Sequence, residues 1–112
     1  MLLDIVIEGG KAHIFSELKP YAELHEVDLY EDGVTIVVRS DGEEIIVDVE
    51  NGKIEAHIPD GRTSSANEEL LLDFKFAGRN VWLFVMSKRR IRIVLSDDKT
   101  IVDGARMKEL NT

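Results

Sequence analysis

The stretch VVRSDGEEIIVDVENGKIEAHI, residues 37–58, decides the fold. Two turn signals, Asp41-Gly42 and Asn51-Gly52, separate runs in which apolar and charged residues alternate. Such alternation is typical of strands with one buried face, and these dipeptides are favoured in two-residue hairpin loops. The stretch therefore predicts three antiparallel strands joined by tight turns.

Two-residue loops also fix which residues lie opposite each other. Around Asp41-Gly42 the opposed pairs are all apolar: Val38–Ile45, Ile36–Val47 and Val34–Val49. Around Asn51-Gly52 they are Val49–Ile54, Val47–Ala56 and Ile45–Ile58. A third loop at Asp32-Gly33 pairs Leu29 with Ile36 and Val27 with Val38. Because three turns place the same residues on one face, we predict a four-stranded sheet over residues 26–59.

The second half of the chain predicts another meander. A two-residue loop at Lys88-Arg89 pairs Met86 with Ile91, Phe84 with Ile93 and Trp82 with Leu95. A three-residue loop at residues 78–80 adds Leu72, Phe74 and Phe76 to the same face. A final strand is expected around residues 100–102. Two sheets that each have one apolar face are most simply buried against each other.

We therefore expect a mainly β, single-domain fold: two antiparallel meanders of about four and three strands plus an N-terminal strand at residues 3–7, packed as a sandwich or open barrel. Short helices are expected at residues 16–24 and 105–110. The alternative is an α+β fold with a helix at residues 66–77, because Ser65-x-x-Glu68 has the pattern of a capping box. We favour a strand there, since Leu70, Leu72, Phe74 and Phe76 share one side only in a strand.

Composition narrows the function. The 112 residues contain no Cys, which excludes disulfides, thiolate nucleophiles and Cys-based metal sites. The formal net charge of −8 disfavours binding to nucleic acid or an anionic membrane. No signal peptide and no apolar run of membrane-spanning length is apparent, so a cytoplasmic protein is expected. Gln is absent while Glu, Lys and Arg are abundant, a bias that resembles thermophilic proteins.

The outer face of the first sheet holds a weak metal-site candidate. Asp48 and Glu55 are predicted to lie directly opposite each other, with His57 two residues further along the same face. Two carboxylates and an imidazole are the ligand types that a divalent metal takes in a chain without Cys. The competing interpretation is a solvated face on which Lys53 and water screen the repulsion.

The segment KRRIR, residues 88–92, is a candidate anion-binding hairpin. It holds Lys88, Arg89, Arg90 and Arg92, four of the 14 basic residues of an acidic chain. A cluster of this kind can contact a phosphate or an acidic partner. The competing interpretation is a charged hairpin tip that protects a sheet from aggregation.

The segment VWLFVM, residues 81–86, is apolar on both sides. With Trp82, Phe84 and Met86 in the core, Val81, Leu83 and Val85 would form an outward stripe together with Val94. Such a stripe has to be covered. We expect either the helix at residues 16–24 or a second subunit to cover it, so these four residues are the candidate interface.

No nucleotide-binding glycine motif and no nucleophile motif is present, and no cofactor is expected. The sequence therefore favours a small non-catalytic interaction or regulatory domain whose partner is a protein or a second copy of itself. An anion- or ligand-binding module that uses Lys88–Arg92 is the first alternative. A metal-dependent enzyme that uses Asp48, Glu55 and His57 is the second.

Overall fold

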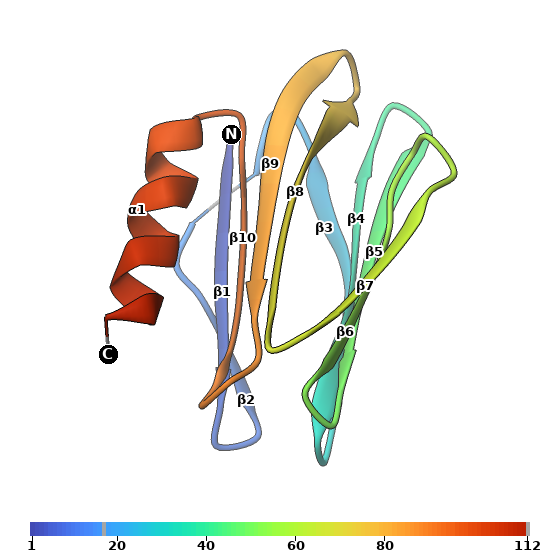
Figure 1. The fold of residues 1–112 in the computed structure, drawn as a ribbon. Helices are drawn as coiled ribbons and strands as arrows, with labels where there is room; N and C mark the ends of the chain where they lie inside the picture. Colours follow the sequence, from blue (N-terminus) through green and yellow to red (C-terminus); the bar gives the residue numbers. More distant parts are fainter. Residues whose placement is uncertain (17, 112) are drawn as a thin grey trace.

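The computed structural model describes residues 1–16 and 18–111, which form two five-stranded antiparallel sheets and one helix in three layers (Figure 1). Sheet A has the order β2 (Lys11–Ile14), β1 (Leu2–Glu8), β10 (Ile91–Ser96), β9 (Arg79–Met86) and β8 (Glu69–Phe76). Sheet B has the order β3 (Glu23–Tyr30), β4 (Gly33–Ser40), β5 (Glu43–Glu50), β6 (Lys53–His57) and β7 (Thr63–Asn67). The helix α1 (Lys99–Leu110) lies on the face of sheet A that points away from sheet B. The mainly β fold of two packed antiparallel sheets is confirmed.

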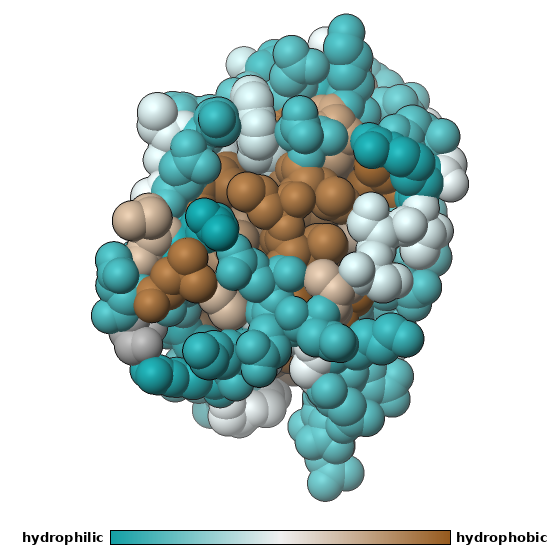
Figure 2. Space-filling model, in the orientation of Figure 1, coloured by the Kyte–Doolittle hydropathy of each residue, from teal (hydrophilic) through white to brown (hydrophobic). Residues whose placement is uncertain are grey.

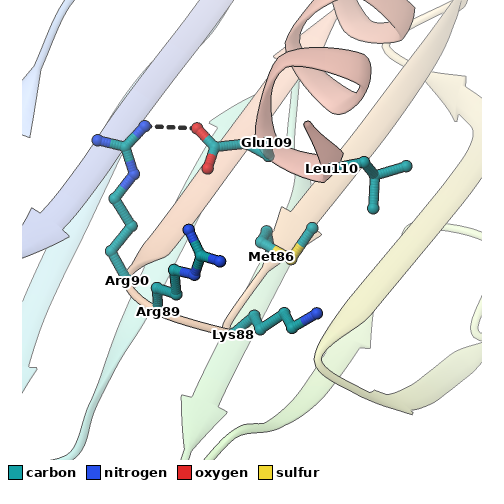
Figure 3. A pocket seen from close by; sticks show the side chains of 6 residues that line it. All are labelled: Met86, Lys88, Arg89, Arg90, Glu109 and Leu110. Atoms are coloured by element: carbon teal, nitrogen blue, oxygen red, sulfur yellow. Dashed lines mark hydrogen bonds and ion pairs between the residues drawn. The ribbon is translucent and has the colours of Figure 1, made fainter. Parts of the chain in front are cut away.

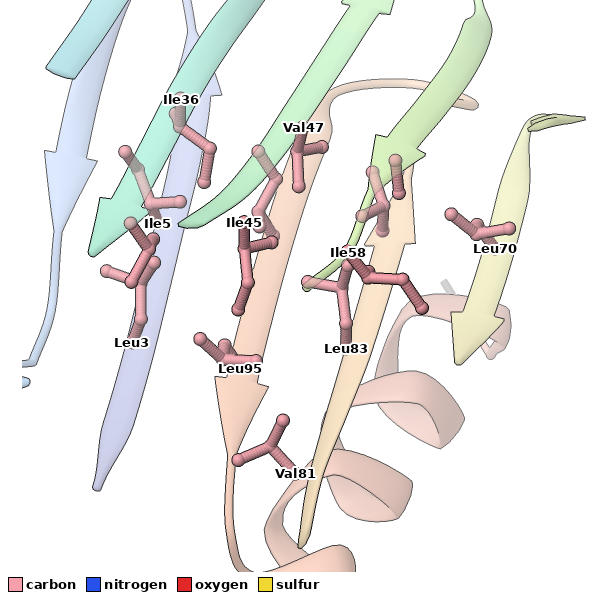
Figure 4. Packing of buried hydrophobic residues seen from close by; sticks show 14 of the residues in the cluster. Leu3, Ile5, Ile36, Ile45, Val47, Ile58, Leu70, Val81, Leu83 and Leu95 are labelled. Atoms are coloured by element: carbon pink, nitrogen blue, oxygen red, sulfur yellow. The ribbon is translucent and has the colours of Figure 1, made fainter. Parts of the chain in front are cut away.

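The core lies between the two sheets (Figure 4). Each inner face supplies aliphatic side chains from alternate positions, as the period of a strand requires. Among the buried residues are Leu3, Ile5, Ile36, Ile45, Val47, Leu83 and Leu95. Within the described residues no helix is long and apolar enough to cross a membrane.

The predicted register of sheet B is correct for β4, β5 and β6. For β3 it is wrong by two residues, because Leu29 lies opposite Val34 and Val27 opposite Ile36. Gly33 explains the error. A Cβ atom at Gly33 would lie 1.8 Å from the Val49 carbonyl oxygen, so this glycine serves a close approach between strands. The loop is Glu31-Asp32, one residue before the predicted turn.

The predicted orientation of β9 is wrong. Leu83 lies opposite Leu95, and Val85 lies opposite Ile93, so Val81, Leu83 and Val85 point into the core between the sheets. Trp82, Phe84 and Met86 point to the opposite side of sheet A, because side chains alternate along a strand. A shift of register by an odd number of residues produces this exchange of faces.

Both hairpin loops that flank β9 differ in length from the prediction. The β8–β9 loop has two residues, Ala77 and Gly78, which both take positive φ angles (50° and 79°). The connection from β9 to β10 spans residues 87–90. Ser87 extends the register between β8 and β9, because its N–H donates to the Glu68 carbonyl (2.9 Å), and its hydroxyl donates to the Gly52 carbonyl (2.8 Å). Ser87 is thus held by β8 and by the β5–β6 turn and does not pair with β10.

The outer face of sheet A is covered by α1, and neither predicted cover is correct. Phe84, Met86, Val94 and Val102 form a second buried cluster between β9, β10 and the helix. Asp98 caps this helix by accepting a hydrogen bond from the Thr100 N–H (3.0 Å). The strand predicted at residues 100–102 is therefore the first turn of a helix that includes the one predicted at residues 105–110.

The remaining corrections concern two segments. The segment at residues 66–77 is not a helix, and residues 66–67 and 69–76 are in strands, as we favoured: β7 ends at Asn67 and β8 begins at Glu69, with Glu68 between them at a positive φ of 68°. Of the helix predicted at residues 16–24, position 17 lies outside the described residues. Residues 16 and 18–22 form no helix, and β3 begins at Glu23. Leu18 is buried there instead.

Candidate functional site

Arg92 is held inside the fold by two carboxylates. Its Nε and Nη2 atoms donate to the two carboxylate oxygens of Asp4 (3.1 and 2.8 Å), a bidentate pair between β10 and β1. Its Nη1 donates to Glu109 Oε1 (2.8 Å) on α1. The Arg92 side chain is only 11% exposed. Its charge is therefore satisfied within the chain and is not available to an anion.

Arg90 shares the same acceptor. Its Nη2 donates to Glu109 Oε1 (2.5 Å), as Figure 3 shows, and its Nη1 lies 3.8 Å from Glu8 Oε2. Burial opposes ionisation of Glu109, but the hydrogen bonds from the two arginines hold its pKa below the ordinary value. The bond to Glu109 raises the pKa of Arg90, and the bonds to Asp4 raise that of Arg92. Arg90, Arg92 and Glu109 are therefore charged at neutral pH.

Of the four predicted anion-binding residues, only Lys88 and Arg89 are exposed and lack an ion pair with the described residues. They line a small cavity of about 40 Å³ together with Met86 and Leu110 (Figure 3). Glu109 lies in the same lining. Arg90, which is paired with Glu109, lies there too, so the structure separates the basic cluster into an internal pair, Arg90 and Arg92, and a two-residue tip.

The metal-site candidate is only partly assembled. Asp48 and Glu55 lie directly opposite each other on β5 and β6, as predicted. Asp48 Oδ1 accepts a hydrogen bond from Thr35 Oγ1 (3.1 Å), which in turn accepts one from the Tyr30 hydroxyl (3.0 Å). His57 Nδ1 lies 3.0 Å from Thr63 Oγ1 on the edge strand β7. Within the described part of the chain, no three His, Asp or Glu side chains come together to hold a metal.

The four candidate interface residues are buried within the chain. Val81, Leu83 and Val85 are at most 1% exposed and lie between the sheets, while Val94 lies under α1. The prediction of an outward stripe fails because β9 faces the other way. None of these residues is at the surface.

An open groove of about 450 Å³ lies at the edge of the sandwich formed by β2 and β3. Its walls are mostly apolar, and its rim carries one residue of each charge, Lys19 and Glu23. The apolar lining residues are Leu3, Ile14, Leu18, Ala22 and Leu24. Ser16 also lines the groove, and its hydroxyl oxygen is buried without a hydrogen-bond partner among the described residues.

One large apolar side chain of the groove lining is exposed, and a second follows it in the chain. Ile14, in its lining, is 52% exposed, and Phe15, which follows it, is 67% exposed. The Phe15 ring stacks on His13 with ring centroids 6.5 Å apart. The sequence analysis missed this site because it assigned residues 16–24 to a helix. The usable signal was the glycine pair Gly9-Gly10, which turns the chain so that residues 11–14 form a short edge strand.

In comparisons with protein-family models, curated proteins and solved structures, nothing matches this chain. The site is therefore interpreted from its own geometry.

Proposed function

We propose that this chain is a non-catalytic protein-binding domain and that the β2–β3 groove receives an apolar segment of its partner. The supporting observation is the exposure of Ile14 in a groove with apolar walls, with the exposed Phe15 next to it in the chain. An exposed bulky apolar side chain within a concave site with apolar walls is typical of a binding surface. We expect such a domain to act in the cytoplasm, the location that the sequence favours.

The charge along the neighbouring edge strand suggests the chemistry of the partner. Residues 23–32, which comprise edge strand β3 and the following loop, contain five carboxylates and no Lys or Arg. These are Glu23, Glu26, Asp28, Glu31 and Asp32. Complementary charge speeds association and selects partners more than it adds affinity. The occupant we propose is a peptide segment with bulky apolar side chains flanked by Lys or Arg.

The two alternatives have less support. Anion binding at residues 88–92 would rest on Lys88 and Arg89, since Arg90 and Arg92 bind carboxylates. Metal-dependent catalysis would need a third ligand beside Asp48 and Glu55, while His57 lies next to Thr63 instead.

A random peptide library displayed on phage tests the proposal. Peptides selected on the wild-type chain should be enriched in Lys or Arg next to bulky apolar residues. Their affinity should fall about tenfold or more in Phe15→Ser and Ile14→Ser, because losses of this size are typical of central apolar anchors. Met107→Ser is the matched control, since Met107 is 54% exposed on α1.

The stability of each variant should be measured alongside, because both substituted side chains are more than half exposed and folding should be unaffected. Selected peptides that bind Phe15→Ser and Ile14→Ser as tightly as wild type would contradict the proposal. Enrichment of acidic peptides would contradict the assigned partner chemistry.

A further inference from the structure

The sandwich has four edge strands, and three of them are poorly suited to pairing with another chain. β2 has four residues, and β7 is a short polar strand of sequence TSSAN. β3 has a register shift between Leu24 and Glu26 and carries only acidic charges, apart from His25. Short strands, irregular ladders and charged side chains are the usual protections of exposed sheet edges, and charges of one sign also repel an identical strand.

β8 is neither short nor irregular, and its exposed charges, Asp73 and Lys75, have opposite signs. It has eight residues, ELLLDFKF, and pairs with β9 without interruption from Glu69 to Phe76. Leu71 on its outer side is 43% exposed. β8 lies at the edge of sheet A nearest the viewer in Figure 1, and Figure 2 shows a hydrophobic area over this part of the molecule, between α1 and sheet B.

The hairpin geometry defines which backbone groups of β8 are free. Phe76 and Arg79 close the two-residue β8–β9 loop, and the closing pair of such a loop exchanges both backbone hydrogen bonds. The backbone groups of Phe76, Phe74, Leu72 and Leu70 therefore form hydrogen bonds with β9. The N–H and C=O groups of Leu71, Asp73 and Lys75 point to the open edge.

We propose that β8 pairs antiparallel with β8 of a second copy of this chain, with the two-fold axis at Phe74. In an antiparallel pair, residues with free backbone groups must lie opposite each other. With the axis at Phe74, Asp73 of each copy lies opposite Lys75 of the other, so two complementary charge pairs form. With the axis at Asp73, the Asp73 side chains of the two copies would face each other. With the axis at Leu72, Asp73 of each copy would face Leu71 of the other. The charges thus select one register.

This pairing joins the two copies of sheet A into one continuous ten-stranded sheet. It satisfies the free backbone groups of both edges and places Phe74 against its counterpart on the inner face. The contact uses the edge opposite the β2–β3 groove in the strand order. It is therefore independent of the function proposed above.

Charge exchange at two positions tests the proposal by sedimentation equilibrium at low salt, where exposed charge pairs are least screened. We expect a dimer for wild type. In a Lys75→Asp dimer, both opposed pairs would consist of two carboxylates, and in an Asp73→Lys dimer both would consist of two ammonium groups. The dissociation constant of the dimer should therefore rise about tenfold or more in each variant. A mixture of the two variants should form a heterodimer, because every opposed pair is then complementary.

The mixture distinguishes charge repulsion from misfolding, because two misfolded variants would not form a dimer when they are mixed. Lys53→Asp is the matched control: it makes the same charge change on β6, away from the edge, and should leave the dimer intact. A wild-type chain that is monomeric at millimolar concentration overturns the proposal. A dimer that Lys75→Asp does not weaken, or variants that fail to associate on mixing, overturn it as well.

Discussion

Replacing Phe84 by alanine tests the orientation of β9 directly. Phe84 is fully buried beneath α1, where it packs in one cluster with Met86, Val94 and Val102. Removing a buried phenylalanine ring loses its transfer free energy and leaves a cavity, so the free energy of unfolding should fall by about 3–5 kcal/mol. The loss by itself does not show which side of sheet A the ring occupies.

A double-mutant cycle with Val102 on α1 supplies that information. Val102→Ala removes two buried methyl groups and should cost about 2 kcal/mol, at roughly 0.8 kcal/mol for each buried carbon plus a small cavity. Because Phe84 and Val102 belong to one cluster, their combined effect should deviate from additivity by about 0.5–3 kcal/mol. Leu83→Ala is the matched control, since Leu83 belongs to the cluster between the sheets. Its effect should add to that of Val102→Ala within about 0.5 kcal/mol.

Urea-induced unfolding followed by circular dichroism gives the six free energies that the two cycles need. The slope of free energy against urea should be the same in all variants, because a change of slope signals a change in the unfolded or native ensemble. Coupling of Val102 with Leu83, and additivity with Phe84, would show that β9 faces the other way. The three-layer description would then be refuted.

Three further predictions follow from single contacts. Glu109→Gln should lower the free energy of unfolding at neutral pH. Because the folded-state pKa of Glu109 is lowered, the difference in this free energy between variant and wild type should shrink as the pH falls below about 4. An equal difference at pH 7 and pH 3 would contradict this. Asp98→Ala should cost about 1 kcal/mol through loss of the helix cap, and Asp98→Ser should restore most of it in urea unfolding. Gly33→Ala should cost about 3 kcal/mol because its Cβ meets the Val49 carbonyl, whereas Gly104→Ala, with open space around it, should stabilise α1 by about 0.5–1 kcal/mol in the same assay.

The sequence predicts sheet B well because its turns are chemically explicit. Asp41-Gly42 and Asn51-Gly52 occupy positions with positive φ, which these dipeptides accept at low cost. Once those two loops are assigned, only one register of β4, β5 and β6 places all their apolar residues on the same face. Gly33 misleads the prediction, because the same residue type is also required where two backbones approach closely. Sequence alone does not distinguish these two uses of glycine.

The orientation of β9 could not be predicted, because both sides of VWLFVM are buried. Alternation identifies the inner face only when the other face is polar. Here one side packs on sheet B and the other on α1, so loop lengths alone determine the register. Those lengths depend on contacts distant in sequence, such as the hydrogen bonds of Ser87 to Glu68 and Gly52.

The basic cluster shows the same limit for the candidate site. The sequence identifies KRRIR correctly as a concentration of charge. It does not show that Asp4, 88 positions from Arg92, lies on the neighbouring strand, or that Glu109 reaches both Arg90 and Arg92 from the helix. Partners at such separations follow from strand order, which sequence periodicity does not encode. The groove was missed for a related reason, because its walls come from β1, β2, β3 and the loop between the sheets.

The two proposed contacts have a joint consequence that can be measured. β2 and β8 are the opposite edges of sheet A, so a dimer through β8 carries two grooves, at its two far edges. A peptide in solution occupies one groove at a time and should bind wild type and Lys75→Asp with the same affinity. On a surface densely coated with that peptide, a dimer that engages two copies should dissociate about tenfold or more slowly than the monomeric variant, because the second contact is intramolecular. Surface plasmon resonance at high and low peptide density separates the two cases. Equal dissociation rates at high density would show that the grooves do not act together, and a lower affinity of Lys75→Asp for the free peptide would show that the two edges are not independent.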